Sequence, residues 1–292
     1  MTERTRAERK LAYLLCSPAA AVMLFVTAYP IGYAIYLSLQ RYDLRFPAET
    51  QFVGFDNYVT VLSSVDLWWK AFGITTFITV VSVAVELIIG LGIALIMHRT
   101  IFGRGIVRTA VLIPYGIVTV VAAYSWAYAW TPDTGYLAKL LGEGSAPLTS
   151  KWSAIAIIIL AEIWKTTPFM ALLLLAGLSL VPNELINAAR VDGASAWQRL
   201  TNVILPMMKP AILVALLFRT LDAFRIFDNI FIMTQGAQDT RSVSILNYDQ
   251  LFTALNLGVG SAMSVLIFLA VALIAVIFIR GFGAAAPGQD LR

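Results

Sequence analysis

Charged residues are scarce in this sequence. They make up 13% of its 292 residues, whereas a soluble domain usually carries about 25%. Apolar residues reach 59%, and the mean hydropathy is +0.80. So little charge cannot cover the surface of a soluble enzyme, and the composition also excludes a disordered protein and a coiled coil. The chain is therefore predicted to be an integral membrane protein.

Cysteine and histidine are almost missing. The single cysteine, Cys16, excludes an internal disulfide bond and a cysteine-based metal site, and we expect it to be a buried thiol. The only histidine, His98, lies beside Arg99 at the end of an apolar run, where a packing or interfacial role is expected. The Asp and Glu residues show no metal-ligand spacing, so no metal site is predicted.

Patterns that bind nucleotides or nucleic acids are also lacking. No Gly-x-x-x-x-Gly-Lys-Ser/Thr loop occurs, so this chain is not expected to bind or hydrolyse ATP. The net charge is +4, but the Lys and Arg residues do not gather with aromatic residues as a nucleic-acid surface requires. We therefore expect a non-catalytic chain that holds no cofactor and has no nucleic-acid partner.

Long apolar runs are what the sequence has in abundance. A helix needs about 20 apolar residues to span a bilayer. Six runs meet this length: Leu11–Gln40, Ala71–Met97, Thr109–Thr131, Trp152–Val181, Pro210–Met233 and Leu251–Ile279. The first run is expected to be broken at Pro18 and Pro30. These runs predict an all-α, polytopic membrane helix bundle with six transmembrane helices in a single domain, residues 1–292.

The distribution of positive charge predicts the orientation of these helices. If the N-terminus is cytoplasmic, the inside segments hold twice as many Lys and Arg residues as the outside segments. The bias is sharpest just before the first run, at Arg4, Arg6, Arg9 and Lys10. The loops of membrane proteins that carry an excess of Lys and Arg are usually cytoplasmic. We therefore expect a multi-pass protein of the cell membrane with both termini in the cytoplasm.

Residues 182–206, between the fourth and fifth runs, differ from an ordinary membrane turn. Pro182 and Asn183 can start a helix, with Glu184 near its positive end. Gly193 can end that helix in a left-handed conformation. The segment is therefore predicted to fold as a helix–glycine–helix hairpin on the cytoplasmic side.

Two properties of this hairpin bear on its role. Ala188 and Ala189 give the first helix a face of small side chains. Trp197 and Leu200 give the second helix an apolar face, and this helix is expected to end at Pro206. A hairpin of this kind suits close approach by a partner protein. It also suits an amphipathic connector that lies on the membrane, and the residues alone leave both interpretations open.

The hairpin resembles the cytoplasmic loop of ATP-binding-cassette (ABC) importer permeases. That motif reads Glu-Ala-Ala, three residues, Gly, nine residues and Ile-x-Leu-Pro, and Asn187-Ala188-Ala189, Gly193 and Val203-Ile204-Leu205-Pro206 keep the spacing. Asn187 replaces Glu, which removes one charge that could pair with an ATPase, and Val203 replaces Ile. By this resemblance, the residues expected to couple the chain to an ATPase are Glu184, Asn187, Ala188, Ala189, Asp192, Gly193, Trp197, Leu205 and Pro206.

Three further segments resemble carbohydrate-importer permeases of the maltose type. They are residues 52–58 (Phe-Val-Gly-Phe-Asp-Asn-Tyr), 167–169 (Thr-Pro-Phe) and 227–230 (Phe-Asp-Asn-Ile). The Gly-Gly-Pro that often follows the last segment is replaced by Gln235-Gly236-Ala237. The likeness covers nearly the whole chain and is strongest to permeases of trehalose importers.

This resemblance implies a fold, partners and a solute. The fold is the transmembrane domain of a type I ABC importer, which works by alternating access. The partners are a second permease, two copies of an ATPase that binds ATP and Mg, an extracytoplasmic sugar-binding lipoprotein and membrane lipids. The implied solute is trehalose or a related disaccharide.

Charged side chains inside the apolar runs are the remaining signal. Such residues are costly in a membrane and usually face the bundle interior. In the fifth run, Arg219, Asp222, Arg225 and Asp228 alternate in sign at three-residue steps, so neighbours can pair along a helix. They form either an ion-pair ladder or part of a sugar path. The other candidates are Glu86, Glu162, Lys165, Thr220 and Asn229.

Two other functions remain possible from the sequence. In a secondary transporter or channel, Glu86, Glu162 or Asp222 would carry protons, although the hairpin and the lack of an internal repeat argue against this. A permease of the same family could also carry another solute, such as a glycerol phosphodiester.

Overall fold

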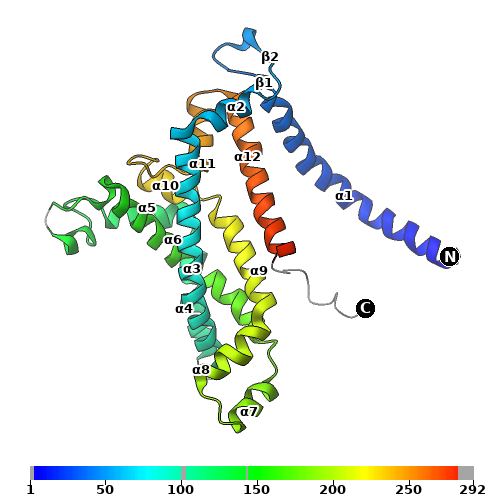
Figure 1. Cartoon of the computed structure of the whole chain (residues 1–292), viewed down its shortest axis with the longest axis vertical. Helices are drawn as coiled ribbons and strands as arrows, with labels where there is room; N and C mark the ends of the chain where they lie inside the picture. Colours follow the sequence, from blue (N-terminus) through cyan, green and yellow to red (C-terminus); the bar gives the residue numbers. More distant parts are fainter. Residues whose placement is uncertain (1–2, 100–102, 143, 282–292) are drawn as a thin grey trace. The chain divides into compact units, whose positions relative to one another are not determined.

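The computed structural model describes residues 3–99, 103–142 and 144–281. Apart from one short pair of strands, its regular elements are helical (Figure 1). Two compact units are present, one of residues 1–64 and 247–268 and the other of residues 65–246 and 269–292. We call them unit 1 and unit 2, and each is described by itself.

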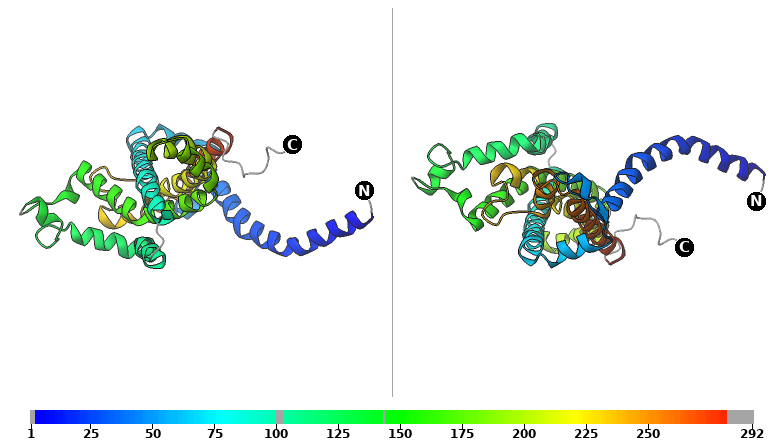
Figure 2. Two further views of the ribbon diagram at one scale, coloured as in Figure 1. Left: turned by 90° about the horizontal axis from the view of Figure 1, so that it is seen from below. Right: turned by 90° about the horizontal axis from the view of Figure 1, so that it is seen from above.

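Unit 1 begins with the long helix α1, Glu3–Ser38. Pro18 and Pro30 lie inside this helix, so the prediction that they break it is wrong. Figure 2 shows that α1 bends into a curve instead. Residues 11–36 of this helix include no buried residue, and Cys16 is exposed rather than buried as expected. Transmembrane helices tolerate proline, and an apolar helix without intrachain packing suits a lipid or protein environment.

A small polar framework follows α1. The strands β1, Gln40–Arg41, and β2, Gln51–Phe52, pair antiparallel, and Gly54 has a φ of +60° just before α2, Asp56–Ser63. Asn57 donates from Nδ2 to the carbonyl oxygens of Ser38 and Gln40, each at 2.8 Å. The 52–58 motif therefore has a structural purpose, since its glycine turns the chain and its asparagine holds α2 against β1.

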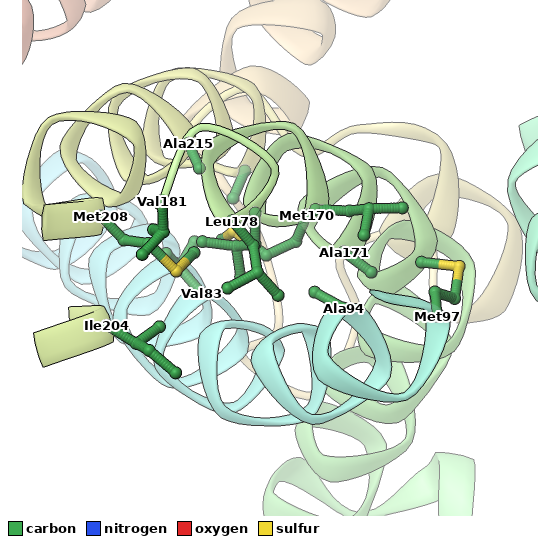
Figure 3. Close-up of a cluster of buried hydrophobic side chains, with 13 residues drawn as sticks. Val83, Ala94, Met97, Met170, Ala171, Leu178, Val181, Ile204, Met208 and Ala215 are labelled. Atoms are coloured by element: carbon green, nitrogen blue, oxygen red, sulfur yellow. The ribbon is translucent and has the colours of Figure 1, made fainter. Parts of the chain in front are cut away.

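The core of unit 2 lies between three long helices. These are α3, Lys70–Arg99, α6, Lys151–Leu178, and α9, Leu205–Ala223, which lie side by side in Figure 1. Buried Met97, Met170, Leu174 and Met208 belong to the cluster drawn in Figure 3. At Gly177 an added Cβ would lie 2.3 Å from the Cβ of Ala211, so only glycine allows α6 and α9 to approach this closely.

The remaining helices of unit 2 are shorter. They are α4, Arg104–Gly116, α5, Thr119–Ala129, α7, Asn183–Val191, α8, Ala196–Arg199, and α10, Asp228–Met233. The short helix α11, Val243–Tyr248, starts in unit 2 and ends in unit 1. The last long helix, α12, Leu257–Val276, starts in unit 1 and ends in unit 2. In the described residues, five helices are long and apolar enough to cross a membrane, or up to six if the bent pair α4–α5 counts as one span.

The third apolar run is not one straight helix as predicted. The helices α4 and α5 meet at an angle of 84°. Gly116, a weak helix former, ends α4, and the carbonyl oxygen of Ile117 accepts a 2.7 Å hydrogen bond from Nζ of Lys165. A backbone group freed inside a membrane needs such a partner, and the side chain from α6 supplies it.

The fifth and sixth runs also differ from their predicted bounds. The chain is helical from Ala196 through a π turn at Leu200–Ile204 into α9, so Pro206 does not end the second hairpin helix. Proline is tolerated in the first turn of a helix, where Pro206 lies. The fifth run is then interrupted between Ala223 and Asp228. The sixth begins at Leu257 rather than Leu251, after Leu255 in a left-handed conformation.

Candidate functional site

Arg219 on α9 is the centre of a buried charged cluster in unit 2. Its side chain has no exposed surface. Nε donates to Oε2 of Glu86 at 2.6 Å, and Nη2 donates to Oε1 of the same carboxylate at 2.9 Å. Nη2 also lies 3.3 Å from Oε1 of Glu162, and Nη1 pairs with Asp222. One guanidinium thus binds carboxylates from α3, α6 and its own helix.

Polar side chains complete the cluster. Asn229 of α10 donates from Nδ2 to Oε2 of Glu162 at 2.7 Å. The Thr166 hydroxyl lies 2.8 Å from Oε1 of Glu86 and 2.6 Å from the carbonyl oxygen of Glu162. Both residues are buried. Because each buried carboxylate has more than one hydrogen-bond partner, the cluster meets the conditions under which charges persist inside a membrane protein.

A polar pocket of about 290 Å³ lies beside this cluster. Glu162, Lys165 and Asp222 are among its charged lining residues. Lys165 is anchored at the α4–α5 bend, with its Nζ 5.9 Å from the centre of the Tyr115 ring, which also lines the pocket. The pocket therefore joins the bend in one span to the interrupted region of another.

The intramembrane charges divide into two groups by exposure. Glu86 and Arg219 are fully buried, whereas the side chain of Asp222 is 71% exposed. Arg225 is exposed and Asp228 half-buried, and both line the pocket. Because α9 ends at Ala223, the predicted three-residue ladder makes an ion pair only at its first step within the described residues.

Several pocket residues were missed by the sequence reasoning. Tyr115, Thr119 and Thr166 line the pocket, whereas the candidate Thr220 is half-buried on α9 and is not part of its lining. Thr166 follows Glu162 by four residues, so both occupy one helix face, and this spacing could have identified it. Tyr115 and Thr119 gave no comparable signal, since the bend that brings them to the pocket was not predicted.

The 182–206 hairpin forms the other candidate site. After α7, Gly193 has a φ of +80°, the left-handed conformation that its sequence position indicates. Ser195 then caps α8, because its Oγ accepts from the Gln198 backbone while its own N–H donates to the Gln198 side chain. These reciprocal bonds fix the entry into the second helix. The hairpin is thus a local, well-capped structure.

Most of the predicted coupling residues lie on the surface of this hairpin. Trp197 is 71% exposed, a large apolar side chain available to another protein. Ala189 and Leu205 are half-buried, and the remaining candidates are exposed: Glu184, Asn187, Ala188, Asp192, Gly193 and Pro206. The hairpin therefore has the accessible surface that a partner requires.

The helices, their bends and the hairpin together define the transmembrane subunit of a type I ABC importer. The structure matches the crystal structure of a bacterial ABC transporter involved in the import of the acidic polysaccharide alginate, with a TM-score of 0.81 and 23% sequence identity. The match covers 96% of this chain and 99% of that chain. The predicted fold class is confirmed, with the third span bent.

The chain belongs to the family of binding-protein-dependent transport system inner membrane components, which residues 86–286 match. It is 65% identical to the trehalose transport system permease protein SugA of Mycobacterium tuberculosis, over 97% of this chain and 92% of that protein. It is 38% identical to the trehalose/maltose transport system permease protein MalF of Thermococcus litoralis, over 94% of each. The chain is a multi-pass, non-catalytic membrane subunit of an ABC importer, and the predicted resemblance is confirmed.

Proposed function

We propose that this chain is a permease subunit of a sugar importer whose solute is trehalose or a related disaccharide. The observation that carries the proposal is the 65% identity to a trehalose permease over 97% of this chain. The proposed importer contains a second permease, two copies of an ATPase that binds ATP and Mg, and an extracytoplasmic sugar-binding lipoprotein. Both termini of this chain lie in the cytoplasm, in agreement with its Lys and Arg distribution.

The pocket beside Arg219 is the proposed contribution of this chain to the sugar path. A disaccharide is an uncharged polyol that is held by hydrogen bonds and aromatic faces. The lining residues Tyr115, Asp222, Asp228 and Asn229 supply both kinds of contact. Ligand pockets usually measure roughly 300–1,000 Å³, so a pocket of about 290 Å³ suits half of a site that the second permease completes.

The 182–206 hairpin is the proposed point at which ATP hydrolysis drives this path. A partner ATPase that moves the hairpin also moves α9, because the chain stays helical from Ala196 to Ala223. Arg219 lies on α9 and connects it to Glu86 on α3 and Glu162 on α6. Motion at the hairpin is thereby transmitted to the helices that line the pocket, which is a route to alternating access.

The test is an ATPase assay on the complete importer. The two permeases, the ATPase and the binding protein are co-expressed and reconstituted in lipid, and hydrolysis is measured with and without trehalose. Trehalose-loaded binding protein is expected to stimulate hydrolysis, and sugar-free binding protein is the control. A complex that assembles but responds only to another solute would overturn the trehalose assignment. Failure of the four proteins to assemble would overturn the proposed composition of the importer.

The alternative of a proton-driven transporter is not favoured. Its three candidate carriers, Glu86, Glu162 and Asp222, all form ion pairs with Arg219. The two mechanisms differ in their energy source. Uptake by the proposed importer is expected to stop when ATP is depleted and to persist when a protonophore collapses the proton gradient, and the reverse pattern would support the alternative.

A further inference from the structure

A second pocket in unit 2 is lined by basic side chains. It has a volume of about 530 Å³ and lies between the end of α3 and the 182–206 hairpin. Arg99 comes from the last turn of α3, Arg190 from α7 and Arg199 from α8, and His98 lies beside them. No Asp or Glu is among the described residues that line it. The pocket thus gathers positive charge from three separate elements.

This charge is not neutralised by the described part of the chain. Arg99 and Arg190 are exposed and form no ion pair there. Arg199 donates from Nη1 to the carbonyl oxygen of Ala194 at 2.5 Å, which leaves its formal charge without a counterion. Like charges that share one space repel, so an anion bound between them would be stabilised by all three.

The rest of the pocket is apolar. Its remaining walls include Leu95 and Leu178 from the ends of α3 and α6, Ile204 from the π turn and the exposed Trp197. A small inorganic anion would leave these side chains unused, whereas a phospholipid has both an anionic headgroup and an apolar body. Tryptophan is also enriched where proteins meet the membrane surface. The combination of charges and apolar walls therefore matches a lipid.

We propose that this pocket binds the headgroup phosphate of an anionic phospholipid from the cytoplasmic leaflet. The proposal rests on the proposed function, whose orientation puts the hairpin on the cytoplasmic side. Basic pockets between helices on that side are suited to anionic headgroups. A phosphate held by Arg99, Arg190 and Arg199 would tie the hairpin to the end of α3, and so couple its motion more firmly to the bundle.

The affinity for lipid tests this site directly. The complete importer is purified in neutral detergent and titrated with phosphatidylglycerol, and native mass spectrometry counts the lipids retained. The double variant R99Q/R190Q is expected to lose about tenfold or more in affinity for the tightest lipid, because two phosphate-binding cations are removed. The variant R99K/R190K keeps both charges and is expected to retain that lipid.

A matched control separates this site from general attraction to the membrane. R280Q removes an exposed arginine near the end of the last long helix, outside the pocket, and is expected to leave the affinity unchanged. An equal loss in R280Q, or no loss in R99Q/R190Q, would overturn the proposal. Displacement of the lipid by inorganic phosphate alone would assign the pocket to a soluble anion and would also overturn it.

Two further outcomes distinguish the lipid site from an ATPase interface and from the proposed function. If R99Q/R190Q loses the ATPase on purification but keeps its lipid, the pocket is part of the ATPase interface and the lipid site is refuted. If the wild-type importer binds the lipid but shows no trehalose-stimulated hydrolysis in any lipid mixture, the proposed function fails while the site stands. If trehalose stimulates hydrolysis but no lipid binds specifically, the lipid site is refuted while the proposed function stands.

Discussion

Arg219 shows how one side chain can organise the interior of this bundle. It satisfies Glu86 by two hydrogen bonds and contacts Glu162 and Asp222 as well. Removing one member of a buried ion pair leaves an uncompensated charge, which is more destabilising than the pair was stabilising. The stability of the protein is therefore expected to fall strongly when the Arg219 cation is removed, and much less when a nearby exposed charge is removed.

Replacing Arg219 with methionine tests this expectation. R219M leaves Glu86 and Glu162 without their cation and is expected to lower the free energy of unfolding by roughly 3–5 kcal/mol. The measurement is the thermal transition of the purified protein in detergent, followed by size-exclusion chromatography. R225Q removes an exposed arginine of the same region and is expected to change stability by less than about 0.5 kcal/mol. Equal losses would contradict the central position of Arg219.

The turn after β1 is held by a contact that depends on pH. Arg45 donates from its side chain and its backbone N–H to the Asp43 carboxylate, which lowers the pKa of Asp43 from 3.8 to about 2. A lowered pKa means that the contact is intact above pH 4 and is lost as the pH falls towards 2. Hydrogen exchange is expected to show protection of the Arg45 amide in the wild type, relative to D43N, that disappears over this range. Protection that is independent of pH would contradict it.

The contacts between helices depend on where small residues lie. The Gly177 position lets α6 approach Ala211 of α9, whereas Gly92 on α3 has open space around it. The turn between α7 and α8 depends on Gly193 for another reason, since nothing crowds its Cβ position but its φ is positive. The first glycine is required by packing and the last by backbone conformation.

Enlarging Gly177 is expected to separate α6 from α9. G177A places a methyl group 2.3 Å from the Cβ of Ala211, and such overpacking costs about 1–3 kcal/mol. The thermal transition should fall, and the second-site change A211G should restore it in part. G92A, which meets nothing within 4 Å, is the matched control and should be neutral or slightly stabilising. No difference between G177A and G92A would contradict the close packing.

Two substitutions of Gly193 test whether the hairpin depends on the left-handed backbone conformation at this position. Valine at a φ of +80° is strained by about 1–2 kcal/mol, whereas asparagine tolerates this conformation better. If the hairpin drives transport as proposed, G193V is expected to reduce trehalose uptake strongly and G193N only mildly, at equal membrane insertion. Equal uptake by both variants, with the ATPase still bound, would show that the geometry of this turn does not matter for coupling.

Across the chain, the sequence predicts local structure better than contacts between distant residues. The spacing around Gly193 predicts both hairpin helices because all the residues involved are neighbours. The partner of Glu86 is Arg219, 133 positions away, and no periodicity connects them. The bend after Gly116 depends on Lys165, which lies 48 positions beyond Ile117 and donates a hydrogen bond to its carbonyl oxygen. Apolar composition located the spans, but their interruptions depend on side chains from other helices.

The orientation of the chain in the membrane can be tested by labelling single cysteines. With Cys16 replaced by serine, single cysteines can be introduced at exposed Val191 in the hairpin and at exposed Lys139 in the loop before α6. A membrane-impermeant maleimide is expected to label K139C in intact cells and V191C only after permeabilisation. The opposite pattern would reverse the topology and place the hairpin outside the cell.

The continuity of the helical segment from Ala196 to Ala223 has a mechanical consequence. Arg219 lies 23 residues beyond Ala196, which corresponds to a rod of about 35 Å at about 1.5 Å per residue. A tilt of about 5° about the hairpin end would displace the guanidinium by about 3 Å over such a length. This displacement is about as long as the hydrogen bonds that Arg219 makes. If a partner ATPase tilts the segment as proposed, Arg219 must therefore either exchange partners or carry Glu86 and Glu162 with it. The charged cluster is therefore expected to switch between distinct sets of ion pairs rather than to deform continuously as the segment tilts.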